Sequence, residues 1–228
     1  MSKDGETGRR GELGDFLRSR RHRLDPSALK LASRRRRTPG LRREEVAERA
    51  GIGTDWYIRL EQGRDVNPSA TTIDSLARAL LLSDAERAHL HALARTGRRA
   101  GFVRETVPDA LGRILDVLAV PAYVTGQRWD ILAWNEKAAG LFMDFSEMPE
   151  ARRNILVYML TEPGARTLFG SGWETEARRM VAQFRADFGL WAGDPAFESL
   201  AGLFNAESAE FRAWWAEHDV RGQASGRK

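Results

Sequence analysis

The side chains best suited to chemistry in this sequence are arginines that can bind anions. Four of them follow one another at Arg34–Arg37, and Arg59 and Arg64 stand farther along, a few residues after Thr54 and Asp55. A guanidinium group offers five N–H donors in a planar fork, which matches both phosphate oxygens and the edge of guanine. These residues indicate that the chain binds a polyanion, with nucleic acid as the first candidate.

The positive charge is concentrated in the first half of the chain, so we expect the polyanion to bind there. Residues 1–100 hold 22 Lys and Arg against 14 Asp and Glu, whereas residues 101–228 hold 14 against 18. A basic half followed by an acidic half predicts that only the first half faces a nucleic acid.

Groups that could support catalysis or bind a metal are sparse. There are four histidines and no cysteine. His89 and His91 are two residues apart on a predicted helix and so face different directions, His22 stands among arginines, and His218 has only acidic neighbours. The sequence also shows no nucleophile elbow and no Gly-rich phosphate loop. We therefore expect no enzyme activity, no cofactor and no bound metal.

The composition predicts a globular protein of the cytoplasm. Hydrophobic residues make up 42% of the 228, enough for one large domain or two small ones. No run of residues approaches the ~18 consecutive apolar residues of a membrane span. Residues 1–11 are polar, unlike a signal peptide, and the lack of cysteine fits a reducing compartment. We expect no membrane association.

Two short helices, at about 43–50 and 54–61, are predicted to position the arginine at residue 59. Ala47 is the small residue needed where the helices cross, and Gly51 can adopt the positive φ of a tight turn. The apolar inward positions are Val46, Ala50, Ile52, Tyr57 and Leu60. The outward face of the second helix is then sized for a DNA major groove, and it consists of Thr54, Asp55, Ile58, Arg59 and Gln62.

Three more helices are expected around this pair. One spans about 11–23, another runs from Ser69 or Thr71 to about residue 81, and a third runs from a capping box at Ser83 and Glu86 to about residue 94. A basic loop at 25–41 contains the four consecutive arginines. Residues 95–105 read as a linker, and residues 1–10 as a disordered tail.

Leu41–Ala47 and Asp55–Arg64 resemble the actinobacterial branch of the xenobiotic-response-element, or lambda-repressor-like, helix-turn-helix family. The resemblance implies a five-helix domain that binds double-stranded DNA, which we place at residues 11–96. We expect a dimer because one such helix covers only half of a site. Arg43 stands where that family often has a phosphate-binding Gln. Tyr57 and Arg42 depart from its usual core residue and helix cap.

Each candidate contact also has a plain structural alternative. Thr54 could simply cap its helix, and Asp55 would need a cytosine amino group or an arginine partner near the phosphates. We expect Glu61 to pair with a neighbouring arginine and Trp56 to pack rather than to stack on bases. The predicted DNA-binding residues are Arg34, Arg35, Arg36, Arg37, Arg43, Thr54, Asp55, Ile58, Arg59 and Arg64.

The second half mixes helices with two short β-prone runs. The runs, at 122–125 and 129–133, are expected to form a hairpin, followed by a helix that Asn135 caps. Further helices are predicted at 109–118, 151–160, 173–188, 195–204 and 208–217.

Asp130–Asn135, Arg152–Asn154 and Glu210–Val220 resemble the MmyB-like ligand-binding domain that follows this kind of helix-turn-helix. The resemblance implies a PAS-like α+β domain, at residues 106–221, with an apolar pocket for a fatty-acyl-like ligand. Aromatic and apolar side chains suit such a pocket, although they could equally form the core. The predicted ligand-binding residues are Tyr123, Trp134, Phe142, Leu156, Met159 and Trp173.

The sheet of this second domain is expected to be incomplete. In the family, the segment that resembles His218–Val220 leads into further strands, whereas here a polar segment, residues 222–228, follows it and reads as a disordered tail. Either a partner chain covers the edge of the hairpin, or the domain is shortened and its ligand site is lost.

The sequence thus predicts a mainly α protein, a lambda-repressor-like domain followed by a PAS-like domain, that acts as a cytoplasmic, dimeric transcription regulator controlled by a small apolar ligand. Two alternatives remain. One is a protein-interaction module, such as an antitoxin-like adaptor. The other is a DNA binder whose sensor domain is degenerate and which acts without a ligand.

Overall fold

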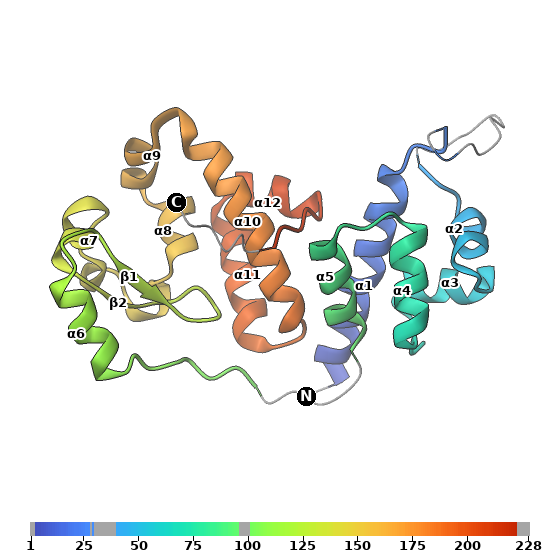
Figure 1. The fold of residues 1–228 in the computed structure, drawn as a ribbon, viewed down its shortest axis with the longest axis horizontal. Helices are drawn as coiled ribbons and strands as arrows, with labels where there is room; N and C mark the ends of the chain where they lie inside the picture. The colour runs from blue at the N-terminus through green and yellow to red at the C-terminus, as the bar shows by residue number, and fades with distance from the viewer. Residues whose placement is uncertain (1–2, 28, 30–39, 96–100, 223–228) are drawn as a thin grey trace.

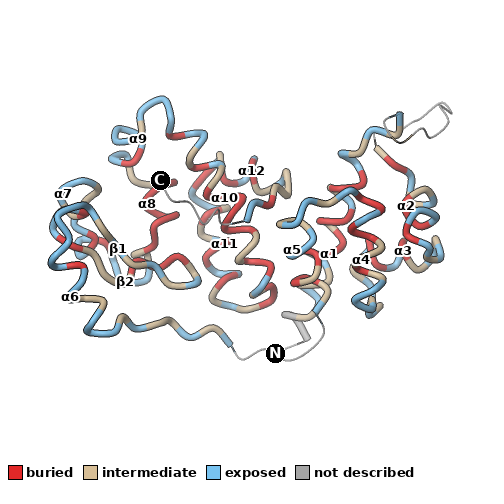
Figure 2. Tube along the Cα trace, in the orientation of Figure 1, coloured by how far each residue is buried: buried red, intermediate tan, exposed pale blue. Residues whose placement is uncertain are grey.

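The chain forms a mainly helical protein built around two separate hydrophobic cores (Figure 1). The computed structural model describes residues 3–27, 29, 40–95 and 101–222. One core lies among the helices of the first half and the other among the elements of the second half, as the buried segments in Figure 2 show. Within the described residues, no helix is both long enough and apolar enough to cross a membrane.

The first core is enclosed by five helices, as predicted. They are α1 (Lys3–Arg23), α2 (Arg43–Ala50), α3 (Thr54–Glu61), α4 (Ala70–Ala79) and α5 (Asp84–Ala94). α1 packs against α3 and α5, and α2 packs against α3 and α4. Of the inward positions of the sequence pattern, Val46, Ala50, Tyr57 and Leu60 are buried and Ile52 is partly buried against the same core, because the helical period places them on one face.

Local signals in the sequence set the ends of these helices. Gly51 ends α2 with a φ of 67°, so the sharp turn before α3 uses the left-handed conformation expected of it. Ser83 accepts a hydrogen bond from the backbone of Glu86 while the Glu86 carboxylate bonds the Ser83 backbone, which confirms the capping box. At the start of α2, the Arg42 backbone N–H donates to Glu45 Oε2 at 2.7 Å, which is the contact that the N3 residue makes in a capping box.

The first helix differs from the prediction because it begins at Lys3. The prediction that residues 1–10 are disordered is therefore wrong from Lys3 onward. Glu6 and Arg10 form an ion pair of 2.9 Å one turn apart, and Arg10 also lies 2.6 Å from Asp65, after α3. These contacts extend a helix that the apolar spacing alone places no earlier than about residue 11.

The second half combines a hairpin with helices of different lengths. Its elements are α6 (Asp109–Val117), β1 (Tyr123–Thr125), β2 (Ile131–Trp134), α7 (Glu136–Leu141), α8 (Ile155–Thr161), α9 (Pro163–Phe169), α10 (Trp173–Leu190), α11 (Pro195–Glu207) and α12 (Ala209–Ala216), with 3-10 turns at Phe145–Glu147, Glu150–Arg152 and Gly170–Gly172. β1 and β2 pair antiparallel, with Tyr123 opposite Trp134. Within the described residues the sheet has only these two strands, so it is incomplete as expected.

Asn135 holds the hairpin to the helices on either side. Its Oδ1 accepts hydrogen bonds from the backbone of Ala138, at 2.9 Å, and of Ala122, at 3.0 Å. Its Nδ2 donates to the Val120 carbonyl at 2.9 Å. The predicted N-cap of α7 is thus also the residue that fixes the start of β1.

Two predicted elements of this half differ from the structure. The helix expected at 151–160 begins at Ile155, because Asn154 caps it by accepting from the backbone of Leu156 and Val157. No helix was predicted at α9, which begins at Pro163. Proline is well tolerated in the first turn, where its missing N–H would have had no partner in the helix.

Candidate functional site

The predicted reading face of α3 is accessible at the end of the molecule. Asp55 and Arg59 are exposed, and Thr54 and Ile58 are partly exposed. In Figure 1, α2 and α3 lie at the end of the first half that is farthest from the second half. Arg64, just after α3, is also exposed. The structure therefore places these five predicted DNA-binding residues on or beside one accessible helix.

A buried carboxylate fixes this helix in the domain. Glu61 has 1% of its surface exposed, and its Oε1 lies 2.5 Å from Nη2 of Arg21, in α1. Arg21 also donates from Nη1 to the Leu41 carbonyl at 2.9 Å. Arg43 Nε donates to Glu61 Oε2. One carboxylate thus joins α1, the start of α2 and the end of α3, which confirms the pairing predicted for Glu61.

Two neighbours of Glu61 have shifted pKa values, Arg43 through a hydrogen bond and Tyr57 through burial. The hydrogen bond with Glu61 raises the pKa of Arg43, which therefore stays charged. The Arg43 side chain is still 41% exposed, so it is anchored at Nε while it reaches the surface beside α3. Burial raises the pKa of Tyr57, whose ring lies in the first core.

Of the remaining residues predicted in the first half, the structure describes Trp56 but not the four consecutive arginines. Trp56 is partly buried against the first core, in agreement with a packing role. Arg34, Arg35, Arg36 and Arg37 lie outside the described residues, so their contact with phosphate stays a prediction.

The six predicted ligand-binding residues fall into two groups. Tyr123, Trp134 and Phe142 surround Phe145, with ring centroids 6.5, 5.6 and 6.2 Å from it. We call these four, together with Tyr158 of α8, the aromatic cluster. Leu156, Met159 and Trp173 are buried elsewhere in the second core, to which Phe145 and Tyr158 of the aromatic cluster also belong, and the Trp173 indole Nε1 donates to the Met159 carbonyl at 2.9 Å.

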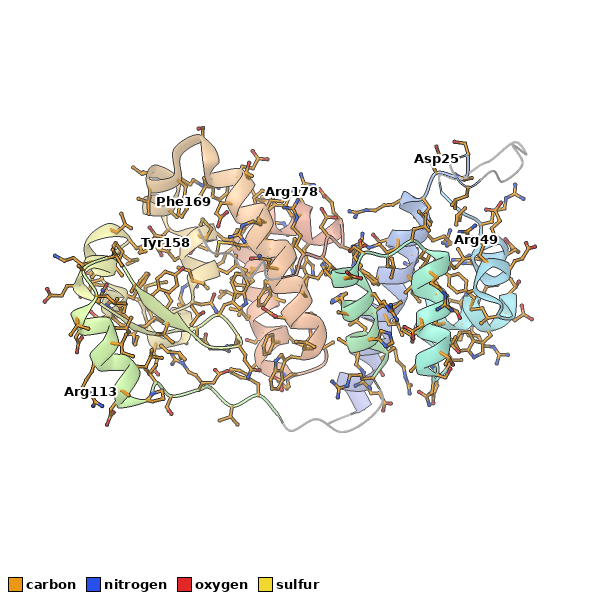
Figure 3. All side chains as sticks on the ribbon, viewed as in Figure 1. Asp25, Arg49, Arg113, Tyr158, Phe169 and Arg178 are labelled. Carbon is orange, nitrogen blue, oxygen red and sulfur yellow. The ribbon has the colours of Figure 1, made fainter. Side chains whose placement is uncertain are left out.

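The Tyr158 hydroxyl is the one polar atom of the aromatic cluster that is buried without a hydrogen-bond partner among the described residues. Figure 3 labels Tyr158 in the second half. Tyr158 is 1% exposed, and its ring lies 5.8 Å from Phe142 and 5.9 Å from Phe145. Burial raises the pKa of this phenol, so the group is neutral and can donate a hydrogen bond. A buried phenol O–H needs an acceptor, which a water molecule or a ligand atom can supply.

A groove of about 410 Å³ lies between the hairpin and α10. Most of the residues that line it were not predicted to bind a ligand. Tyr123 is the one predicted ligand-binding residue that lines it. We call this cavity the α10 groove; it is lined by Tyr123, Thr125, Gly126, Gln127, Trp129, Ile155, Glu176, Arg179, Met180, Gln183, Asp187, Leu190 and Trp191.

Polar side chains of α10 form one wall of this groove. Arg179 Nε donates to Glu176 Oε2 at 2.8 Å, and its Nη1 donates to Gln183 Oε1 at 2.8 Å. Across the groove, Trp129 Nε1 donates to Asp187 Oδ2 at 2.7 Å and joins the hairpin to α10. The signal that could have revealed this wall is the polar repeat 176, 179, 183 and 187 on an otherwise apolar helix face, which looks like a solvated stripe in the sequence.

The described residues contain no group of three His, Asp or Glu side chains arranged to hold a metal ion. The described residues offer two surfaces for recognition: an exposed helix with arginines in the first half, and an aromatic cluster with an adjoining groove in the second.

Comparison with known families separates the same two halves. Residues 12–90 match a helix-turn-helix domain, and residues 107–228, more than half of the chain, match the MmyB-like transcription regulator ligand binding domain. No curated protein matches the chain.

Proposed function

The chain belongs to the MmyB-like transcription regulators, with a helix-turn-helix domain before the ligand-binding domain, and from this we propose that it binds a specific double-stranded DNA operator through α3. We retain residues 11–96 and 106–221 as the limits of the two domains. We also propose that the protein acts in the cytoplasm and has no catalytic activity of its own.

The observation that carries DNA binding is the exposed face of α3 held by a buried anchor. Arg59 is exposed on the helix that Glu61 fixes to Arg21 and Arg43. A recognition helix must project side chains into the major groove while its own position is rigid. We assign base contacts to Thr54, Asp55, Ile58 and Arg59, and phosphate contacts to Arg34–Arg37, Arg43 and Arg64.

We further propose a homodimer. One helix of this size reads only half of a typical operator, and a two-fold dimer places two such helices about one turn of DNA apart. Light scattering of the free protein and of the DNA complex measures the mass directly. A monomer in both states would contradict this part of the proposal.

The second domain is proposed to bind a small molecule with a large apolar part, of fatty-acyl type. The aromatic cluster supports this, because its rings offer apolar surface and the buried Tyr158 hydroxyl is a donor in need of an acceptor. Mass spectrometry of compounds retained by the purified protein tests whether such a ligand is bound.

Selection of bound sequences from a random duplex library, followed by affinity measurements in a salt series, tests the DNA-binding proposal. A specific regulator enriches one motif and still prefers it at physiological salt, although its affinity falls steeply as salt rises. Enrichment of no motif would contradict the proposal and favour a protein-interaction module. A motif bound with no effect of any retained compound would indicate a DNA binder with a degenerate sensor domain.

A further inference from the structure

Helix α1 holds the end of α3 on one of its faces. Arg18 Nη2 donates to the Glu61 carbonyl at 3.2 Å, in addition to the ion pair of Arg21 with the Glu61 carboxylate. The two backbones also approach closely, since a methyl group on Gly14 would come within 2.5 Å of the Glu61 carbonyl oxygen. Packing this close leaves α3 little freedom relative to α1, so a displacement of α1 also displaces α3.

The segment that follows α12, residues 217–220, binds α1 as well, and we call it the clasp. Arg23 lies 2.5 Å from Asp219 Oδ1, and its Nη2 donates to the Glu217 carbonyl at 2.8 Å. Ser19 Oγ donates to the same carbonyl at 3.3 Å. A segment of the second half thus binds the end of the first helix through several polar contacts.

Two further residues of the clasp make buried contacts with the first domain. His218 adopts a φ of 54°, which turns the chain out of α12, and its carbonyl accepts a hydrogen bond from Nη2 of Arg20. Arg20 is itself 3% exposed, with its Nε 2.9 Å from Glu86 in α5. Val220 is buried and belongs to the first core. The clasp is therefore built into the DNA-binding domain and does not merely rest on its surface.

Helix α10 ties the clasp to the second domain. Arg178 of α10, labelled in Figure 3, pairs with Glu217. Arg185, also in α10, is fully buried, and its Nη1 lies 3.1 Å from His218 Nδ1. The same nitrogen lies 3.3 Å from Glu12 Oε2, in α1. A movement of α10 therefore reaches both the clasp and α1.

The contacts with α3 and those with the second domain lie on opposite faces of α1. Since 3.6 residues complete a turn, positions 14, 18 and 21 share one face, and positions 12, 19, 20 and 23 share the face about 180° away. In Figure 1, α12 and the segment that follows it lie on the side of the second half that faces α1 and α5. Helix α1 is thus held between α3 and the second domain, and its position depends on both.

We propose that the clasp positions α3 for the operator by holding α1 from the opposite face, so that operator affinity depends on how firmly the second domain holds this segment. This rests on the proposed function, because it names the regulation of the proposed DNA-reading surface. The clasp residues act through Arg21 and Glu61, and are therefore positioning residues. Any state of the second domain that moves α10 away from α1 then weakens operator binding, since it favours a different position of α1.

The ratio of the affinities for the selected operator and for a random duplex separates positioning from simple destabilisation. A loss of folded protein lowers both affinities by the same factor, whereas a displaced α3 loses base contacts and keeps most phosphate contacts. Val220→Ala removes part of the clasp from the first core without a change of charge. We expect it to lower the ratio by about threefold or more, slightly below the usual range of allosteric coupling because only two methyl groups are lost.

Val157→Ala is the matched control for this variant. Val157 lies in α8 and is buried in the second core, so the substitution removes the same two methyl groups away from the clasp. It should destabilise the protein, as any loss of buried methyl groups does, and change the affinity ratio by less than about 1.5-fold.

Reversal of the Arg23–Asp219 ion pair gives a second test that needs no change in the core. Asp219→Arg alone brings two guanidinium groups together and should lower the ratio by about threefold or more; adding Arg23→Asp re-forms the pair with the opposite polarity and should restore the ratio to within about twofold. Arg152 and Glu207 form an ion pair of similar exposure within the second domain, at 2.6 Å. Glu207→Arg is therefore the control and should leave the ratio unchanged.

Circular dichroism establishes that each variant is folded before its affinities are compared. If Val220→Ala does not fold, the ion-pair variants decide. Folded clasp variants with the wild-type ratio would overturn the proposal and leave the clasp as a structural contact only. A ratio that the reversed pair does not restore, or that the controls lower equally, would overturn it as well. A wild-type protein that prefers no duplex over another would instead refute the proposed function.

Discussion

Gly189 lies so close to the ring of His89 that a methyl group on it would sit 2.4 Å from both Cε1 and Nδ1 of the imidazole. The ring is buried between α5 and α10 and has little room to retreat. The absence of a side chain at residue 189 is therefore what allows the two domains to pack together.

Gly189→Ala should weaken the contact between the domains. Overpacking a close contact costs about 1–3 kcal/mol, so the unfolding free energy should fall by that amount. Gly202→Ala is the control, because Gly202 also lies within a helix, α11, and a methyl group there meets nothing within 4 Å. The control should be neutral or up to about 1 kcal/mol more stable, since alanine favours helix. Calorimetry that finds both variants equally stable would refute the importance of this contact.

Glu61→Gln should destabilise the helix-turn-helix strongly. The substitution keeps the shape of the side chain but leaves the buried guanidinium of Arg21 without its counter-ion, which costs about 3–5 kcal/mol at buried pairs. Glu48→Gln, on the exposed side of α2, should change stability by less than about 0.5 kcal/mol. Urea unfolding followed by circular dichroism measures both. A loss below 1 kcal/mol for Glu61→Gln would show that the network does not hold α3 in place.

Arg59→Ala should relax the sequence preference of the protein at one base pair. Loss of a bidentate contact to guanine costs about 1–3 kcal/mol for the preferred base and little for the others. Arg78→Ala removes the same charge from α4, away from the reading face, and should leave the preference unchanged. Binding to a set of operators with single substitutions distinguishes the outcomes. Equal weakening for all operators would assign Arg59 to a phosphate instead.

Neutralising Arg34–Arg37 together should reduce the salt dependence of DNA binding. Each phosphate contact contributes about −0.9 to the slope of log K against log salt, so loss of several contacts flattens the plot measurably. Substitution of Arg113, Arg166, Arg212 and Arg221 in the second half changes the net charge equally and should leave the slope nearly unchanged. An unaltered slope after the first substitution would place the four arginines in solvent rather than on DNA.

Features that depend on neighbouring residues could be read from the sequence. The apolar spacing of α2 and α3, the turn at Gly51 and the capping box at Ser83 are local, and each occurs where it was predicted. Periodicity works here because burial of one helix face requires little knowledge of the partner.

Features that depend on distant residues could not be read in the same way. Arg185 looks like one more surface arginine in the sequence, yet Glu12, Trp215 and His218 surround it. Val220 is assigned by the sequence to the second domain, within Glu210–Val220, yet it fills the core of the first domain. The periodicity and composition of a segment do not show which distant residues it contacts in the folded protein.

His89 should make the folded protein sensitive to acid. Burial, together with the positive charges of Arg185 and Arg20 and the nearby His218, lowers the pKa of His89 from 6.5 to about 3. Between these values the unfolded chain binds a proton that the folded protein does not. Stability due to this group is therefore complete above pH 6.5 and is lost progressively as the pH falls toward 3.

His89→Phe removes the titration while it keeps a flat ring against Phe16. Relative to the variant, the wild-type protein should lose about 2 kcal/mol of unfolding free energy between pH 7 and pH 5, because one proton is taken up on unfolding over about 1.5 pH units. Urea unfolding at constant ionic strength over this range measures the difference. The residual slope of the variant includes His218, whose pKa burial also lowers to about 3. Parallel curves for the two proteins would mean that His89 becomes protonated without unfolding, and hence that the interface opens to admit water in mild acid.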